Sequence, residues 1–283
     1  MKNKYQRTLI QSAVLATGLG SGIALAGPIE VEPAPEMEVA TEDVVSGSLS
    51  LDFNSHFVSY GVDVWNDGDS MSDPTFNPSL ELAFALPGDV TFTLGTWWDV
   101  NSKAQSTLGG RIQEIDVWAG LSKDFGPVSL GVTYQAWMYA GTTEEILDIS
   151  IGYDTFLSPS LVIHNRLDSG ASGGDTGTVL VLGLEHGIEA GPVSISFPFS
   201  IAYFTDEGFH GTGPIAAGGA DSGIGYASFG VGFSVPLSTV VGEAYGDWDL
   251  HGGLTYYVTD RDVIPGRAKG DFLTANVGLG LSF

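Results

Sequence analysis

The ionisable residues that most clearly suggest a functional site are carboxylates at alternating positions inside apolar segments. Asp99 lies near the end of one such segment, and Glu114 and Asp116 open the next. Successive side chains of a strand point to opposite faces, so two consecutive segments that form a hairpin bring Asp99 beside Glu114 or Asp116. Three carboxylates this close titrate together. A ring of acids favours cations, and the pattern therefore predicts a cation-attracting constriction.

The same face carries further charged and aromatic residues. The candidates for lining a lumen and setting its selectivity are Asp99, Glu114, Asp116, Asp148, Arg166 and Asp249, and the inward set extends to Asp52, Glu81, Asp247, His56, His164 and His251. An alternative stays open, in which the lumen is closed and the acids pair with Arg166, Lys103 or Arg111.

Aromatic residues share this inward register. Trp97, Trp118 and Trp137, joined by Tyr139 and Tyr257, either form a track for sugar rings or nucleosides or fill space inside the protein. The opposite face carries rings that suit membrane interfaces, namely Trp98, Tyr134, Tyr153, Phe197, Tyr203, Phe233, Tyr256 and Phe283.

No pattern indicates covalent catalysis, a metal or a cofactor. A nucleophile needs a base held beside it, but the five histidines are scattered, and the chain has no cysteine. No two histidines lie at metal-ligand spacing. The acid-dense segment 66–73 lacks EF-hand spacing, and we interpret it as a solvated loop, with a divalent-ion site as the alternative.

The segments that must position these residues follow a period of two, which is typical of strands with one face in an apolar phase. Their length of ~10–14 residues is enough to cross a bilayer when tilted. We predict twelve strands, at residues 45–58, 76–86, 90–101, 111–122, 128–139, 145–154, 159–167, 178–187, 192–203, 223–236, 244–258 and 271–283. The first is expected to carry a bulge near Phe57 and Val58, and the eighth is apolar on both faces, so its register stays open.

The connections alternate in length, as in outer-membrane barrels. Short turns are expected at 87–89, 123–127, 154–159 and 187–191, and long polar loops at 59–75, 102–110, 168–177, 204–222 and 259–270, with 140–144 and 237–243 as exceptions. The sequence therefore predicts an all-β fold, a transmembrane antiparallel up-and-down β-barrel of about twelve strands.

Composition agrees with a protein that faces lipid. Charged residues make up 16% of the chain, against about 25% in soluble domains. The net charge of −24 excludes nucleic-acid binding, which depends on Lys and Arg.

Three regions are expected along the chain. Residues 1–26 combine basic residues, an apolar run and the Ala24-Leu25-Ala26 cleavage pattern, and are interpreted as a signal peptide. Residues 27–44 form an acidic, Pro-rich periplasmic tail, and residues 45–283 form the barrel.

Four stretches resemble the TorF-like porin family of Gram-negative outer membranes. They are SLDFNSHFVSYGVDVWNDG (50–68), FNPSLELAF (76–84), EIDVWAGLSKDFGPVSLGVTYQAWMY (114–139) and EEILDISIGYD (144–154), although Tyr60 stands where the family usually has Arg. The ending ANVGLGLSF is similar to the C-terminal signal of many outer-membrane barrels. The resemblance implies a barrel and a pore, and no catalytic residues.

These observations favour an outer-membrane porin-like channel for passive diffusion of small solutes, with cations preferred. The alternative is a structural or surface-interaction barrel with a plugged lumen that acts through its extracellular loops. The expected partners are outer-membrane lipid, lipopolysaccharide, small solutes and the barrel-assembly machinery, the last through the C-terminal strand.

Overall fold

The computed structural model describes residues 44–211, 220–242, 245–265 and 270–283. The predicted signal peptide and nearly all of the acidic tail lie outside these residues. No helix in the described part of the chain is long and apolar enough to cross a membrane.

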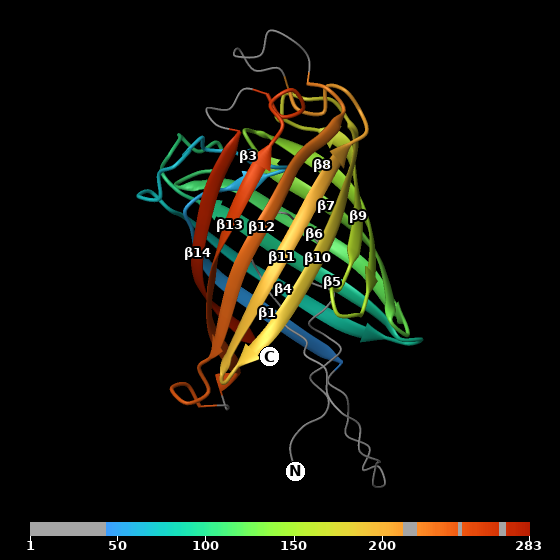
Figure 1. The fold of residues 1–283 in the computed structure, drawn as a ribbon, viewed down its shortest axis with the longest axis vertical. Coiled ribbons are helices and arrows are strands. Elements are labelled where there is room, and N and C mark those ends of the chain that lie inside the picture. Colours follow the sequence, from blue (N-terminus) through green and yellow to red (C-terminus); the bar gives the residue numbers. More distant parts are fainter. Residues whose placement is uncertain (1–43, 212–219, 243–244, 266–269) are drawn as a thin grey trace.

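Twelve long strands close into a single antiparallel barrel, in which each strand pairs with its neighbours in the chain and the first long strand also pairs with the last (Figure 1). The barrel strands are β1 (Val45–Asn54), β4 (Thr75–Leu86), β5 (Val90–Val100), β6 (Ile112–Phe125), β7 (Val128–Tyr139), β8 (Thr142–Tyr153), β9 (Ser160–Ser169), β10 (Gly177–Ala190), β11 (Val193–Phe204), β12 (Gly223–Pro236), β13 (Asp247–Thr259) and β14 (Asp271–Ser282). The predicted fold and strand number are confirmed.

Two short strands, β2 (Val58–Ser59) and β3 (Val62–Asp63), form a separate hairpin between β1 and β4. The prediction that the first strand runs to residue 58 with a bulge was wrong. β1 ends at Asn54, and Ser55 then forms two hydrogen bonds with the backbone of Ala275 on β14. Beyond that point the chain leaves the barrel wall, because β2 pairs with β3 rather than with a neighbouring barrel strand.

The connections divide the barrel into two ends. At one, which we call the turn end, the links are 87–89, 126–127, 154–159, 191–192 and 237–246, and the described chain begins there, beside Phe283. At the other, the loop end, lie the links 55–74, 101–111, 140–141, 170–176, 205–222 and 260–270. The predicted alternation is confirmed, with both of its exceptions.

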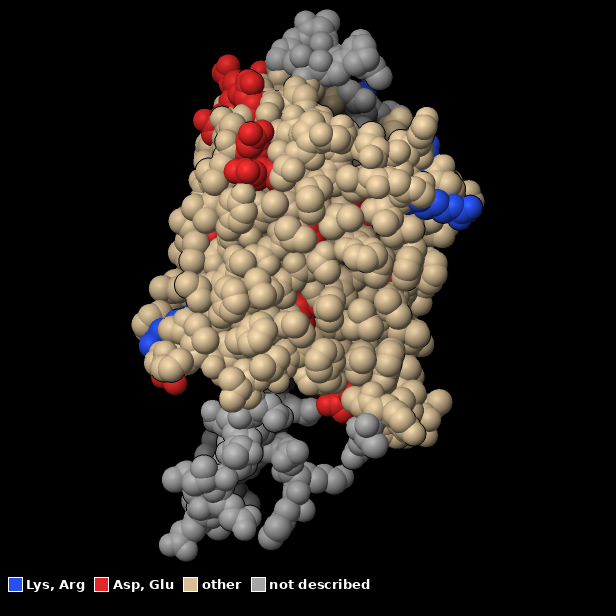
Figure 2. Space-filling view, turned by 180° about the vertical axis from the view of Figure 1, so that it is seen from behind, with Lys and Arg blue, Asp and Glu red and all other residues tan. Residues whose placement is uncertain are grey.

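The two faces of the wall differ in polarity. Exposed apolar side chains cover the outer face, and all eight predicted interface rings are among the exposed residues. On the face shown in Figure 2, few charged side chains lie across the middle of the barrel, and most of them gather toward its two ends. The buried apolar cluster lies inside the barrel, where inward residues of the wall meet residues of the loop-end connections.

Candidate functional site

The β2–β3 hairpin folds into the lumen at the loop end. Its two-residue turn consists of Tyr60 and Gly61, with φ of 48° and 76°, the left-handed pair that a tight hairpin of this twist requires. A Cβ at Gly61 would overlap the ring of Tyr226 on β12. The turn therefore lies against the barrel wall, and position 61 has room only for glycine.

Aromatic contacts show that this hairpin crosses the lumen. The Tyr60 ring lies 5.4 Å from the ring of Trp137 on β7, 5.8 Å from that of His164 on β9 and 5.0 Å from that of Phe209, counted between centroids. The ring of Phe57 lies 5.1 Å from that of Trp97 on β5. Because its contacts come from several sides of the wall, the hairpin fills the lumen at this level. We call residues 55–74 the plug.

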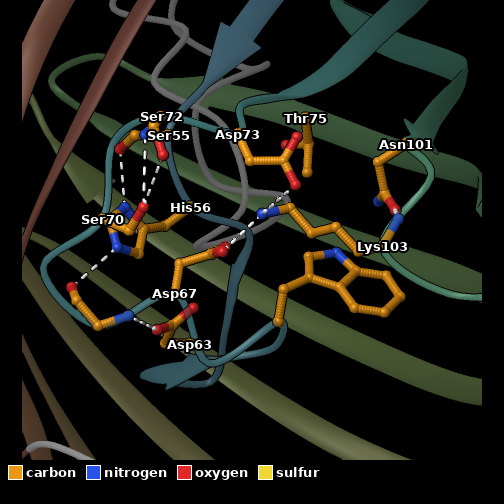
Figure 3. Close-up of polar contacts among 12 residues, drawn as sticks. Ser55, His56, Asp63, Asp67, Ser70, Ser72, Asp73, Thr75, Asn101 and Lys103 are labelled. Atoms are coloured by element: carbon orange, nitrogen blue, oxygen red, sulfur yellow. Dashed lines mark hydrogen bonds and ion pairs between the residues drawn. The ribbon is translucent and has the colours of Figure 1, made fainter.

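Polar contacts fix the outer part of the plug (Figure 3). Lys103 Nζ lies 2.6 Å from Asp67 Oδ1 and 3.7 Å from Asp73 Oδ2. Gly68 donates its backbone N–H to Asp63 Oδ2 at 2.9 Å, and its carbonyl oxygen lies 3.0 Å from Nε2 of His56. His56, predicted as a partial lumen base, therefore belongs to the plug.

The predicted acid constriction lies next to the plug. Asp99 pairs with Glu114 across β5 and β6, and Asp116 points to the same face, so the predicted proximity is confirmed. Their exposed fractions are only 0%, 8% and 0%. Asp99 accepts hydrogen bonds from Trp65, Asn77 and Asn101. In this conformation the three acids do not line open water.

Arg166 on β9 forms its ion pair with an acid that was not among the candidates. Its Nε donates to Glu144 Oε1 at 2.6 Å, and Nη1 donates to the carbonyl of Phe209 at 2.7 Å. The guanidinium also lies over the rings of Tyr60 and Phe209, at 5.1 and 3.7 Å. Glu144 was missed because it lies one residue before the expected start of its strand, whereas β8 begins at Thr142.

Asp148 is part of a buried chain of hydrogen bonds. It lies 2.6 Å from Nδ1 of His164 and accepts a hydrogen bond from Gln135, which in turn accepts one of 3.1 Å from Trp137 Nε1. Of the predicted aromatic residues, Trp97 and Trp137 belong to the buried cluster, and Trp118, Tyr139 and Tyr257 pack against it while partly exposed. All five point inward, as predicted.

The start of the connection after β11 is also held in place. Asp206 Oδ2 accepts hydrogen bonds from the Thr205 hydroxyl at 2.6 Å and the Thr178 backbone N–H at 2.8 Å. These two donors lower the pKa of Asp206 below its ordinary value. They fix the start of the segment that delivers Phe209 to the plug.

A second charged cluster spans the seam where the barrel closes. His251 on β13 has Nδ1 2.8 Å from Asp249 Oδ1 and Nε2 2.7 Å from Asp52 Oδ1 on β1. These side chains pass over Gly278 and Gly280 of β14, where a Cβ would collide with them. Sequence reasoning placed each residue inward but could not bring them together, because β1 and β13 are almost 200 residues apart in sequence.

Ser50 lies beside this cluster, so a serine, a histidine and a carboxylate follow one another as in the catalytic triad of a hydrolase. Its Oγ is 3.4 Å from Nε2 of His251 and donates to Asp52 Oδ2 at 2.6 Å. A catalytic histidine needs a free lone pair to take the proton of the serine. Both ring nitrogens here lie within hydrogen-bond distance of carboxylate oxygens, which leaves neither free to take the serine proton. The geometry holds the ring between two carboxylates and does not position it as a general base.

The turn-end half of the lumen is lined by small residues. The inward positions include Ser122, Ser129, Ser150, Ser160, Ser194 and Ser234, all of them half-buried. These positions leave this half partly accessible to water, although Thr93 and Ser196 on its inward face are buried. Glu81, Glu185 and Asp249 point into it, and Arg166 is the one Lys or Arg at an inward strand position among the described residues.

Comparisons with protein-family models and with curated protein sequences found no match. The resemblance to TorF-like porins is not confirmed and stays a prediction.

Three solved structures illustrate what this chain is similar to. A membrane protein from a study of in-meso crystallization is 9% identical, over 84% of this chain and 83% of that chain, with a TM-score of 0.45. A bacterial polysaccharide outer membrane secretin is 9% identical, over 86% and 99%, with a TM-score of 0.42. The anion-selective porin from Comamonas acidovorans is 10% identical, over 84% and 98%, with a TM-score of 0.34. At these scores the likeness assigns no function, and the architecture rests on the strand pairing itself.

Proposed function

We propose that this chain is a porin-like channel of a Gram-negative outer membrane, passing small solutes by diffusion. One observation carries the proposal: a closed twelve-stranded barrel with an apolar, aromatic-bearing outer face and a polar inner face. Only closed barrels and helices satisfy every backbone hydrogen bond in lipid, and alternation of apolar-out with polar-in is the pattern of outer-membrane barrels.

Cation preference belongs to the same proposal and is argued from this chain's own charges. The Comamonas acidovorans porin is named anion-selective, so no charge preference is transferred from it. The water-accessible half of the lumen contains Glu81, Glu185 and Asp249, opposed there by His251. Inward carboxylates attract cations. The buried Asp99, Glu114 and Asp116 would join such a path once the plug leaves the lumen.

The plug favours a second candidate, in which the barrel stays closed and acts through its loop-end connections. Phe57, Asp99 and Asp116 are fully or almost fully buried at the level of the plug. Solutes therefore pass only if residues 55–74 move. The two candidates share one fold and differ in whether that movement occurs.

A planar-bilayer measurement under a salt gradient separates them. The test compares the full chain with a variant in which a linker of about four residues replaces residues 57–71. Such a linker suffices because Asn54 and Thr75 are paired across β1 and β4. Discrete, cation-selective openings of the full chain are expected for a channel. If the full chain does not conduct and the shortened variant does, the closed barrel is favoured. If neither protein conducts, although a heat-modifiability assay shows that both are folded, the channel proposal is wrong.

Export and partners complete the proposal. Residues 1–26 would direct secretion, and the C-terminal strand ending at Phe283 would engage the barrel-assembly machinery. The apolar belt would contact lipid, and the loop end would meet lipopolysaccharide. We propose no enzymatic role, no cofactor and no nucleic-acid partner.

A further inference from the structure

The inner end of the water-accessible half is marked by an indole beside a carboxylate. Trp118 on β6 donates from Nε1 to Glu81 Oε2 on β4 at 2.8 Å. β5 lies between these strands, and its residue opposite Trp118 is Gly95. A Cβ at Gly95 would overlap the ring atoms of Trp118. The indole therefore lies against the barrel wall over Gly95, where it is half-buried.

This pair lies at the boundary between the two halves of the lumen. Toward the loop end, the next inward residues on β5 and β6 are Trp97 and Asp116, which are buried beneath the plug. Toward the turn end, the next inward residues are Thr93 and Gly120, which are buried but small. Glu81 and Trp118 are both half-buried, so each keeps part of its surface accessible, unlike Asp116 at the closed level.

The chemistry of the pair selects one class of solute. One oxygen of Glu81 accepts the indole N–H, which holds the carboxylate at the edge of the ring. An aromatic face attracts a cation through its quadrupole, most strongly for tryptophan. A carboxylate at the ring edge adds direct charge attraction. We propose that Glu81 and Trp118 form a binding site for a small organic cation of the ammonium type.

This inference deepens the proposed channel function by naming a solute class, but it is tested by equilibrium binding without any current. The probe is choline, titrated calorimetrically into the full chain folded in detergent. The matched neutral probe is 3,3-dimethylbutan-1-ol, in which carbon replaces the quaternary nitrogen. Choline is expected to bind at least tenfold more tightly than the alcohol.

Three variants locate the site. Glu81→Gln keeps an oxygen to accept the indole N–H and removes the charge, and Trp118→Leu removes the aromatic face. Each is expected to weaken choline binding about tenfold. Glu185→Gln is the control, because Glu185 is also an inward, half-buried carboxylate, on β10. It is expected to change binding less than twofold.

Three outcomes would overturn the site. The first is equal binding of choline and the alcohol, and the second is no binding of choline. The third is a loss of choline binding in Glu185→Gln as large as that in Glu81→Gln, which would show general attraction by an acidic lumen. Heat-modifiability confirms that each variant is folded. A chain that binds choline but never conducts would uphold the site and refute the channel.

Discussion

Trp65 of the plug donates a hydrogen bond of 2.9 Å from its indole Nε1 to Oδ2 of Asp99 on β5. The bond joins the plug directly to the acid layer of the wall. Trp65→Phe keeps most of the ring and leaves the buried carboxylate one donor short. The free energy of unfolding in urea is expected to fall by about 1–3 kcal/mol.

The control for this change is Trp98→Phe. Trp98 faces outward, is exposed, and donates from Nε1 to Thr96. Trp98→Phe removes the same indole N–H but leaves no buried carboxylate without a hydrogen-bond donor. Equal losses of stability in the two variants would contradict a specific bond between the plug and Asp99.

The turn at the tip of the plug gives a second prediction. Gly61→Ala adds a Cβ at a φ of 76° and in contact with the Tyr226 ring, whereas Gly88→Ala adds one at a φ of 83° with nothing within 4 Å. Both variants carry the backbone strain of about 1–2 kcal/mol, and Gly61→Ala adds about 1–3 kcal/mol from overpacking. Urea unfolding of both variants measures the difference. If they are equally stable, the tip is not packed against β12.

The architecture was largely predictable because it depends on local signals. The period of two fixes which face each strand turns inward, and pairing of neighbouring strands then places Asp99 beside Glu114. The eighth predicted strand, apolar on both faces, was the exception, since its register follows only from pairing. In the structure, Val179 of that strand lies opposite His164, so it points inward.

The plug could not be predicted from such signals. Residues 45–58 were expected to form the first strand and residues 59–75 a long polar loop, and a plugged lumen was an alternative for which no plugging segment was named. The aromatic residues that insert, Phe57 and Tyr60, are few and follow no period. Their burial depends on partners from distant strands, such as Trp97 and Trp137. The His251 cluster was missed for the same reason, since it exists only once the barrel has closed.

A third prediction concerns the ion pair that holds the plug to connection 101–111. The side chains of Lys103 and Asp67 are 9% and 13% exposed, so each is poorly solvated without the other. A double-mutant cycle with Lys103→Met and Asp67→Asn is expected to give a coupling energy of about 1–3 kcal/mol. Asp73→Asn is the control, because its carboxylate is 3.7 Å from Lys103 and 74% exposed, which predicts less than about 0.5 kcal/mol. A coupling energy near zero would show that the plug is not held at this point.

The last prediction concerns the seam. His251→Ala leaves Asp52 and Asp249 without the cation that lies between them. Asp249 is partly exposed, so the loss of stability is smaller than for a fully buried ion pair. We expect the free energy of unfolding in urea to fall by about 2 kcal/mol. The triple variant Asp52→Asn, Asp249→Asn and His251→Gln removes every charge and is expected to recover at least half of that loss. His186→Ala is the control, since His186 bonds a backbone carbonyl rather than a carboxylate. If the triple variant is no more stable than His251→Ala, the seam is held by packing around Gly278 and Gly280 and not by charge.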